Sequence, residues 1–238
     1  MAKVLIDKKG NKYLWTSGDL HTHFGKVSER DIKENTTGKV FSHLKKECII
    51  FNAAFADAVD HIRRGPAVIT KKDIGAVIST AGITSTSRIV DVGTGSGMLA
   101  FHLAKISPYI TGYEKNPTFY AIAKENAKNL GIEITIKNKD ALKGIDEENV
   151  DLVMIDVKEP WFMLGHAAKA LKSGGFCVAY LPHTSQVQQL CGEAEKYSFY
   201  VQKVSETIER EWVIDNQKSR PKGTGLLHTG FLVFLRKY

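Results

Sequence analysis

The chain has 238 residues, enough for one large domain or for a main domain with a small addition. Hydrophobic residues make up 43% and charged residues 25%, which is typical of a folded globular protein and excludes a disordered or fibrous chain. The net charge is +7, and no apolar run is long enough to cross a membrane.

Nothing at the start of the sequence predicts export, because charged residues appear too early for the apolar core of a signal peptide. The three cysteines, Cys48, Cys177 and Cys191, are widely spaced, so we expect reduced thiols rather than disulfides or a metal site. These features predict a cytoplasmic protein without a metal and without membrane contact.

The positive charge is concentrated at the two ends of the sequence. Residues 1–65 contain 12 basic and 8 acidic residues, residues 66–201 contain 14 of each, and residues 202–238 contain 7 and 4. A charge that served solubility alone would be spread more evenly, so the segregation favours a polyanionic partner.

The first part of the chain, residues 1–65, predicts a small β-rich domain that ends in a helix. Alternating residues around a Lys-Gly-Asn turn predict a hairpin over 4–15, and 19–25 is a further alternating segment. Strand and helix signals are mixed over 48–62, where apolar residues at helical spacing favour a helix. A Gly-Pro pair ending at Pro66 then breaks the pattern.

From residue 66 to residue 238 strands and helices alternate. We expect helices over 73–81, 98–105, 117–130, 161–171 and 185–196, and strands over 88–92, 109–114, 132–137, 150–156, 176–181, 200–211 and 226–235. The alternation predicts an α/β domain with a doubly wound sheet of seven strands, in which the two successive final strands make an antiparallel edge. The polar stretch 215–225 between them predicts a mobile loop.

A glycine-rich turn follows the first strand of this sheet. The motif is Asp91-x-Gly93-x-Gly95-x-Gly97, whereas a dinucleotide-binding fingerprint would need glycine at the position of Met98. The motif resembles the S-adenosylmethionine loop of class I methyltransferases. That resemblance implies a cofactor site whose loop residues are Asp91, Gly93, Thr94, Gly95, Ser96 and Gly97. The alternative is a tight strand-to-helix turn without a ligand.

Acidic residues stand at the ends of the next three strands. Glu114 follows the second strand, where a carboxylate can accept both ribose hydroxyls of a nucleoside. Asp140 follows the third strand, and the resemblance implies that it meets the adenine amino group. Asp156 follows the fourth. Because ligands of open parallel sheets sit outside the carboxyl ends of the strands, we add Asp156 and the neighbours Lys115 and Ala141 to the expected cofactor site.

Four segments resemble the tRNA (adenine-N1)-methyltransferase family, whose members modify adenine 58 in the T-loop and, in archaea, also position 57. They are 21–25 (His-Thr-His-Phe-Gly), 64–73, 156–161 (Asp-Val-Lys-Glu-Pro-Trp) and 228–236, and they occur in order along nearly the whole chain. The resemblance implies a class I Rossmann-like methyltransferase with a small β-rich N-terminal domain, S-adenosylmethionine as cofactor, tRNA as substrate and a homotetramer. It also implies that His228 faces the catalytic crevice, although an ordinary hydrogen-bonded histidine fits the sequence equally well.

The chemistry of N1 methylation assigns a role to Asp156. N1 of adenine already has an in-plane lone pair, so its methylation needs alignment more than a strong base. The product ring is cationic, and a carboxylate beside it would orient the N6 amino group and stabilise the developing charge. The target base is stacked in folded tRNA and must be extruded into the pocket.

The expected substrate site contains cations and one departure from the family. Many members carry a ring where this chain has Thr70, so Trp161, Phe24 or Tyr180 would have to stack on the base instead. A second group of residues is expected to contact tRNA phosphates, namely Arg63, Arg64, Lys71 and Lys72.

Two other functions compete with this one. A small-molecule methyltransferase of the precorrin type shares the glycine motif but predicts neither an N-terminal β domain nor basic flanks. A non-catalytic RNA-binding subunit predicts loss of the glycine loop or of Asp156, and this chain retains both.

Overall fold

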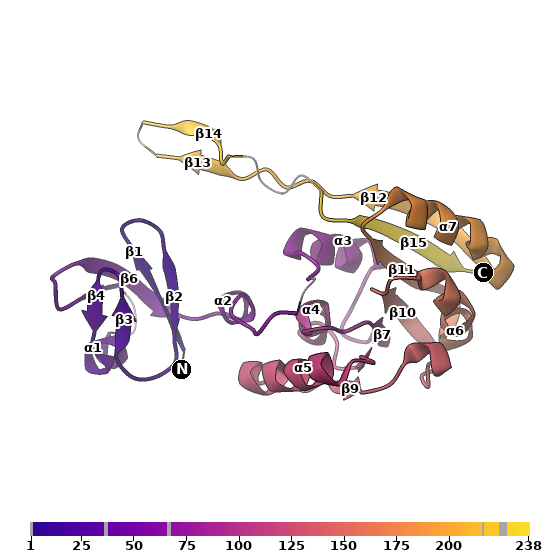
Figure 1. Cartoon of the computed structure of the whole chain (residues 1–238), viewed down its shortest axis with the longest axis horizontal. Helices are drawn as coiled ribbons and strands as arrows, with labels where there is room; N and C mark the ends of the chain where they lie inside the picture. Colours follow the sequence, from indigo (N-terminus) through magenta and orange to yellow (C-terminus); the bar gives the residue numbers. More distant parts are fainter. Residues whose placement is uncertain (1, 36–37, 66–67, 216, 224–227) are drawn as a thin grey trace. The chain divides into compact units, whose positions relative to one another are not determined.

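The computed structural model describes residues 2–35, 38–65, 68–215, 217–223 and 228–238. Parts of the expected break at Pro66, of the expected loop 215–225 and of the expected strand 226–235 therefore lie outside the described residues. The chain divides into two compact units, Met1–Ile62 and Arg63–Tyr238 (Figure 1). We call them the N-terminal unit and the C-terminal unit.

The N-terminal unit is built on a four-stranded antiparallel sheet with the strand order β2-β1-β6-β5. Its strands are β1 (Lys3–Asp7), β2 (Lys12–Trp15), β5 (Gly38–Phe41) and β6 (Glu47–Asn52), and a separate hairpin consists of β3 (Leu20–Thr22) and β4 (Gly25–Val27). The predicted hairpin is present as the pair β1–β2. Alternate residues such as Leu5, Trp15 and Ile50 point into a core that also holds Phe24.

Two expectations for this unit were wrong or incomplete. The expected helix over 48–62 is strand β6 followed only by the short helix α2 (Phe55–Val59), because Cys48 and Ile50 are buried and Ile49 is exposed, a period of two. Helix α1 (Glu29–Glu34) was not predicted. Its signal was Ser28, whose hydroxyl accepts a hydrogen bond from the Asp31 backbone N–H at 3.1 Å.

The C-terminal unit contains the predicted seven-stranded sheet, with the order β12-β15-β11-β10-β7-β8-β9. Its strands are β7 (Ile89–Val92), β8 (Ile110–Tyr113), β9 (Thr135–Lys137), β10 (Val150–Ile155), β11 (Leu171–Leu181), β12 (Phe199–Glu206) and β15 (Phe231–Lys237). Strands β7 to β11 pair in parallel, while β15 is antiparallel to both β11 and β12. The last strand is thus inserted inside the sheet, and the penultimate strand forms the edge.

Helices cover both faces of this sheet (Figure 1). They are α3 (Lys71–Ala81), α4 (Met98–Ala104), α5 (Pro117–Leu130), α6 (Leu164–Ala170) and α7 (Thr184–Ala194). Helices α6 and α7 pack on one face through a buried cluster that includes Val90, Ile155, Leu164 and Leu190. Figure 1 shows α3, α4 and α5 on the other side of the sheet. Because both faces are covered, strands such as β7 and β10 are apolar along nearly their whole length.

Three predicted boundaries were wrong. The helix expected over 161–171 is a 3₁₀ turn, η2 (Pro160–Met163), followed by α6, and strand β11 begins at Leu171. The strand expected over 200–211 ends at Glu206. The expected loop contains a second hairpin of β13 (Trp212–Ile214) and β14 (Ser219–Pro221). Within the described residues, no helix has the length and apolar character needed to cross a membrane.

Candidate active site

A cleft of about 390 Å³ opens at the carboxyl ends of the parallel strands in the C-terminal unit. The predicted cofactor residues that line it are Gly93, Gly95, Glu114, Lys115, Asp140, Ala141 and Asp156. The structure therefore brings together residues from four strand ends that are up to 63 positions apart in the sequence. The other four predicted cofactor residues, Asp91, Thr94, Ser96 and Gly97, lie behind this surface.

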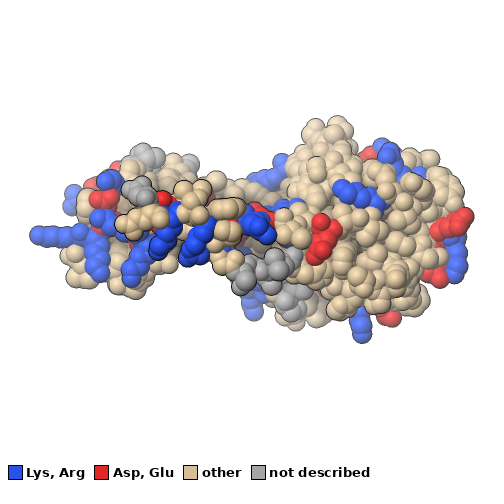
Figure 2. Space-filling model, turned by 90° about the horizontal axis from the view of Figure 1, so that it is seen from above, with Lys and Arg blue, Asp and Glu red and all other residues tan. Residues whose placement is uncertain are grey.

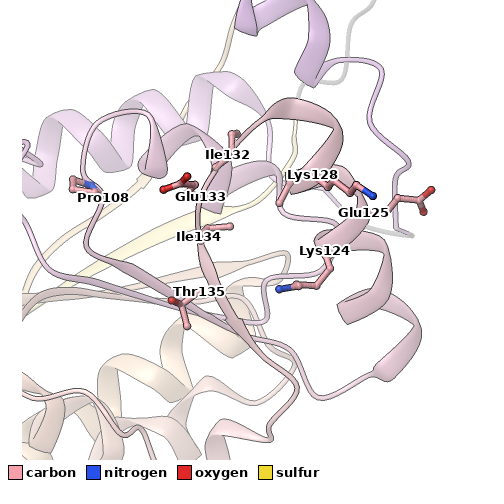
Figure 3. Close-up of a pocket in the computed structure, with 9 residues that line it drawn as sticks. Pro108, Lys124, Glu125, Lys128, Ile132, Glu133, Ile134 and Thr135 are labelled. Carbon is pink, nitrogen blue, oxygen red and sulfur yellow. The ribbon is translucent and has the colours of Figure 1, made fainter.

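A larger depression of about 910 Å³ lies between α5 and β9 (Figure 3). Lys124 and Lys128 reach it from α5, and Pro108 and Thr135 mark the amino ends of β8 and β9. Ligands of parallel sheets bind at the carboxyl ends of the strands, and the predicted motif residues line only the smaller cleft. We therefore assign the active site to the smaller cleft.

The glycines of the loop are required by close approaches. Gly93 has φ +88°, and a Cβ there would lie 2.2 Å from the carbonyl oxygen of Asp156. Gly97 has φ +95° and caps α4, and a Cβ there would overlap the Phe101 ring. Any other residue at either position would push the loop out of the cleft wall. The Thr94 hydroxyl donates to the Asp91 carbonyl oxygen at 3.2 Å and so holds the turn from behind.

Asp91 is a buried carboxylate that lacks a hydrogen-bond partner on one oxygen. Its side chain is 1% exposed, and Oδ2 has no donor among the described residues. Burial, together with the negative charges of Asp156 and Glu114, raises the pKa of Asp91 to about 7. Asp91 does not line the cleft itself but directly precedes Val92 and Gly93, which do. An acceptor without a partner at that place fits a ligand that carries a cationic or N–H group.

Glu114 is held rigidly at the end of β8. Its Oε2 accepts the Gly95 backbone N–H at 2.9 Å, and its Oε1 accepts the Asn116 N–H at 2.7 Å. Each carboxylate oxygen can accept a further bond, so the fixed carboxylate suits a pair of hydroxyl donors. This is the arrangement that recognition of a ribose requires.

The far end of the cleft combines one carboxylate with apolar side chains. Asp140 caps the 3₁₀ turn η1 (Ala141–Lys143) by accepting the Leu142 N–H at 3.0 Å. Leu142 is 45% exposed and Phe162 is 59% exposed, although both line the cleft. Sequence reasoning missed both residues, together with Phe119. The apolar walls suit a flat ring, so the carboxylate acceptors and the apolar surfaces fit the S-adenosylmethionine that the motif implies.

Asp156 lies where β10 ends. Its backbone N–H donates to the Val92 carbonyl at 2.8 Å, which extends the pairing of β10 with β7 by one residue. Burial, with the nearby charge of Glu114, raises the pKa of Asp156 to about 6. The group is therefore mostly ionised near neutral pH, although burial makes its charged form less favourable than in water.

A second buried polar group, the Asp73 cluster, joins three distant segments beside the site. It consists of Thr70, Lys72, Asp73, Tyr180 and Thr229. Asp73 Oδ2 accepts the hydroxyls of Thr70 at 2.7 Å and Thr229 at 2.9 Å, and the Tyr180 hydroxyl lies 3.4 Å away. Lys72 Nζ donates to Asp73 Oδ1 at 2.9 Å and to Thr229 at 2.7 Å. Burial, with the charges of Asp73 and Asp156, raises the pKa of Tyr180 to about 12.

These contacts show where the structure places the expected substrate residues. Lys72 is only 10% exposed and is bound to Asp73, so its surroundings favour a positioning role over contact with phosphate. Arg63 lies 3.9 Å from Glu125, on α5. Arg64 and Lys71 also have interactions within the chain. Of the four expected phosphate-binding cations, Lys72 is thus largely buried in an ion pair, whereas Arg63, Arg64 and Lys71 are exposed.

The three candidate stacking rings lie in different surroundings. Phe24 belongs to the core of the N-terminal unit and is ruled out. Trp161 is half-buried against the core below α6, with its ring 5.9 Å from that of Phe162. Tyr180 is half-buried and is held by the Asp73 cluster. The charge of Asp156 contributes to the raised pKa of Tyr180, so Tyr180 lies within electrostatic range of that carboxylate.

His228 is placed differently from the catalytic expectation. Its Nδ1 bonds to Glu206 Oε1 and its Nε2 lies 3.0 Å from the Pro182 carbonyl oxygen. Both partners are acceptors, so the ring is favoured as imidazolium and the pKa of His228 is raised, chiefly by Glu206. The exposed His228 is absent from the lining of the cleft, which favours a structural role between β11 and β15.

The sheet order with its inserted antiparallel strand, the glycine turn and the row of strand-end carboxylates define a class I S-adenosylmethionine-dependent methyltransferase. A solved S-adenosylmethionine-dependent O-methyltransferase of Thermotoga maritima superposes with a TM-score of 0.92 at 26% identity, covering 99% of this chain and 92% of that one. Residues 58–226 match the family described as tRNA methyltransferase complex GCD14 subunit.

Two relatives extend the match to the whole chain. The tRNA (adenine(58)-N(1))-methyltransferase TrmI of Thermus thermophilus is 31% identical over 99% of this chain and 96% of its own length. The tRNA (adenine(57)-N(1)/adenine(58)-N(1))-methyltransferase TrmI of Methanocaldococcus jannaschii is 30% identical over 98% and 94%. The chain belongs to the tRNA (adenine-N1)-methyltransferase family.

Proposed function

We propose that the protein methylates N1 of adenine 58 in the T-loop of tRNA, with S-adenosylmethionine as methyl donor. The observation that carries the proposal is the position of Asp156, a half-buried carboxylate in the wall of the cofactor cleft. Support comes from the two relatives named for this activity, which match along nearly the full length of the chain.

The residues of the cleft divide the binding work among them. Glu114 accepts hydroxyls of the ribose, Asp140 and the apolar walls hold the adenine, and Asp91 receives a donor from the methionine portion. When bound, S-adenosylmethionine supplies an electrophilic methyl group. The backbone of Gly93 and Gly95 forms the floor of the cleft, since neither residue carries a Cβ.

Asp156 orients and stabilises the target adenine and does not need to remove a proton from it. N1 of adenine attacks through a lone pair that is already available, so no proton needs to leave it. As the bond to carbon forms, positive charge spreads into the ring and its N6 amino group. The Asp156 carboxylate accepts a hydrogen bond from N6 and stabilises that charge, because burial keeps water from screening it.

The target adenine reaches Asp156 only after it leaves the stacked T-loop. In place of the ring that many relatives carry at position 70, we propose that Tyr180 supports the extruded base. Its hydroxyl is anchored by the Asp73 cluster, which fixes the position of its aromatic ring. Trp161, which is half-buried against the core, supports the turn that carries Asp156.

Further proposals rest on the family alone. Methylation at the neighbouring position 57 is a second activity to test, since the relative from Methanocaldococcus jannaschii is named for both positions. We also propose a homotetramer and a cytoplasmic location. The precorrin-type alternative gains no support from the N-terminal unit, which the two full-length relatives share with this chain.

Incubation with labelled S-adenosylmethionine and an unmodified tRNA transcript tests the proposed function directly. Nucleoside mass spectrometry of the digested RNA should show 1-methyladenosine. Absence of methyladenosine, with transfer instead to a tetrapyrrole or to a hydroxyl of a small molecule, would overturn the proposal.

A further inference from the structure

Five exposed lysines gather at one end of the sheet in the N-terminal unit. Lys8 and Lys9 belong to the turn between β1 and β2, Lys12 is the first residue of β2, and Lys45 and Lys46 belong to the turn between β5 and β6. Strands β1 and β6 are antiparallel neighbours, with Asp7 opposite Cys48. The register therefore brings the two turns to the same end of the sheet, which we call the lysine end.

The lysines of the lysine end differ from the other exposed cations of the unit because they form no ion pairs with carboxylates among the described residues. Within the described part of the chain, none of the five ammonium groups lies within 4.0 Å of a carboxylate. Each of the other exposed Lys and Arg side chains of the unit forms an ion pair with an acidic residue. Four such pairs are Lys26–Asp19, Arg30–Glu34, Lys33–Glu29 and Lys39–Glu47, at 2.8 to 3.0 Å.

The two carboxylates at this end are already occupied. Asp7 is buried, and its oxygens accept the backbone N–H groups of Lys9 and Asn11 and the Asn11 side-chain amide. Glu47 is bound to Lys39 at 2.9 Å. Five lysines without carboxylate partners in the described ranges therefore face solvent together. Figure 2 shows Lys and Arg side chains in blue over the part of the chain that Figure 1 draws as β1 to β6.

Apolar side chains flank the same lysines. Phe41 is 53% exposed at the end of β5, and Leu44 is 54% exposed in the turn that also carries Lys45 and Lys46. A surface of unpaired lysines with an exposed aromatic ring suits a phosphate backbone with its sugars and bases.

We infer that the lysine end is a docking surface for the phosphate backbone of RNA. It is a contact with the substrate in addition to the contact at the cofactor cleft. The inference rests on the proposed function, because that function makes tRNA the polyanion at hand. Each lysine that meets a phosphate releases a counterion, so the surface contributes to affinity and to its salt dependence rather than to the chemical step.

The test compares two variants of the full chain with the same change in charge. The first replaces Lys8, Lys9, Lys45 and Lys46 with Gln; the second replaces the ion-paired Lys26, Arg30, Lys33 and Lys39 with Gln. Binding of a tRNA transcript is measured by filter retention from low to moderate salt. We expect the first variant to reduce the slope of log affinity against log salt by about 2–3 and the affinity at least about tenfold. The second should leave the slope within about 1 of the parent value.

Equal losses in both variants, or no loss in the first, would overturn the inference. Circular dichroism verifies folding, and the pairs Lys8 and Lys9 or Lys45 and Lys46 are also replaced separately, each with about half the change in slope expected. Because retention measures binding without methyl transfer, its outcome is separate from that of the proposed function. Methylation with an unaltered slope contradicts only the docking surface, and salt-dependent binding without methylation contradicts only the activity.

Discussion

At the scale of single residues, the site is governed by carboxylates that share one small volume. Asp91, Glu114 and Asp156 come from β7 and from the ends of β8 and β10, and the negative charge of Glu114 contributes to the raised pKa of both Asp91 and Asp156. Glu114 is stabilised by two backbone N–H donors, whereas Asp91 has an oxygen without any donor. The ligand-free site is thus electrostatically strained, and a ligand with positive charge relieves it.

Replacing Asp156 with Ala should lower turnover by about 10²- to 10³-fold, because the developing charge on the base loses its partner. Cofactor affinity, measured by calorimetry, should change by less than about tenfold, since Glu114 and Asp140 remain. Asp156→Asn keeps an acceptor for the N6 amino group without the charge and should recover part of the rate. Turnover equal to the parent in Asp156→Ala would remove this residue from the mechanism.

The raised pKa of Asp91 makes the stability of the ligand-free protein depend on pH. The folded protein holds a proton on Asp91 up to about pH 7, whereas the unfolded chain loses it near the ordinary value of 3.8. This contribution to the free energy of unfolding is complete below about pH 4 and is lost as the pH rises to about 7, by at most about 1.4 kcal/mol per unit. Urea unfolding of Asp91→Asn should show a smaller fall over that interval; an identical fall contradicts the assignment.

At the scale of elements, the glycine turn and the Asp73 cluster fix the ends of strands and helices around the cleft. The turn places Gly93, just after β7, against the Asp156 carbonyl just after β10, and the cluster ties the start of α3 to β11 and to the segment before β15. The hydroxyl of Thr70 caps no backbone N–H of α3 and binds Asp73 instead. A local capping interaction is thereby exchanged for a tertiary one.

Gly93→Ala should destabilise the protein by at least about 3 kcal/mol, since the new Cβ meets the Asp156 carbonyl and φ is positive. Gly131→Ala is the matched control, because Gly131 also has a positive φ of +59° but open space around it. We expect that control to cost about 1 kcal/mol in thermal or urea unfolding. An equal loss of unfolding free energy in both variants would show that the close approach of Gly93 to Asp156 does not contribute to stability.

Thr229→Val should cost about 1–3 kcal/mol, because Lys72 and Asp73 each lose a buried hydrogen-bond partner. Thr229→Ser retains the hydroxyl and should stay within about 0.5–1 kcal/mol of the parent in urea unfolding. If the cluster also positions Tyr180, Thr229→Val should lower turnover more than its effect on the tRNA KM explains. If Thr229→Val and Thr229→Ser had the same stability and turnover, the hydrogen bonds of Thr229 in the Asp73 cluster would have no role.

At the scale of the whole molecule, the charge separates a neutral cofactor region from basic ends. Residues 66–201 carry equal numbers of basic and acidic side chains, and they contain the cleft residues apart from Gly65. The five lysines of the lysine end, which have no carboxylate partners among the residues that the structure describes, all lie between residues 8 and 46. Recognition of a large polyanion and chemistry on one base are therefore assigned to different parts of the chain.

A tRNA transcript with guanine in place of adenine 58 tests the target position. We expect methyl incorporation to fall to background, because guanine lacks both the N1 lone pair and the N6 donor that Asp156 accepts. A transcript changed only at position 57 is the control and should be methylated like the parent. Substantial methylation of the position-58 variant, mapped to 57, would show that the protein also uses the second site.

The sequence by itself determined the alternating fold, the glycine turn and the identity of the strand-end acids, because period, glycine spacing and strand ends are local properties of the chain. It misjudged 48–62, where a period of two competed with a helical one, and it missed the hairpin β13–β14 within a polar stretch. Only the tertiary structure decided that Lys72 is bound to Asp73, that Phe24 is buried in a core, and that His228 bonds to Glu206 outside the cleft. The hydrogen-bond partners of Lys72 and His228 are between 1 and more than 20 positions away in the sequence. Which of them a side chain binds depends on burial, and burial arises only when the sheet assembles.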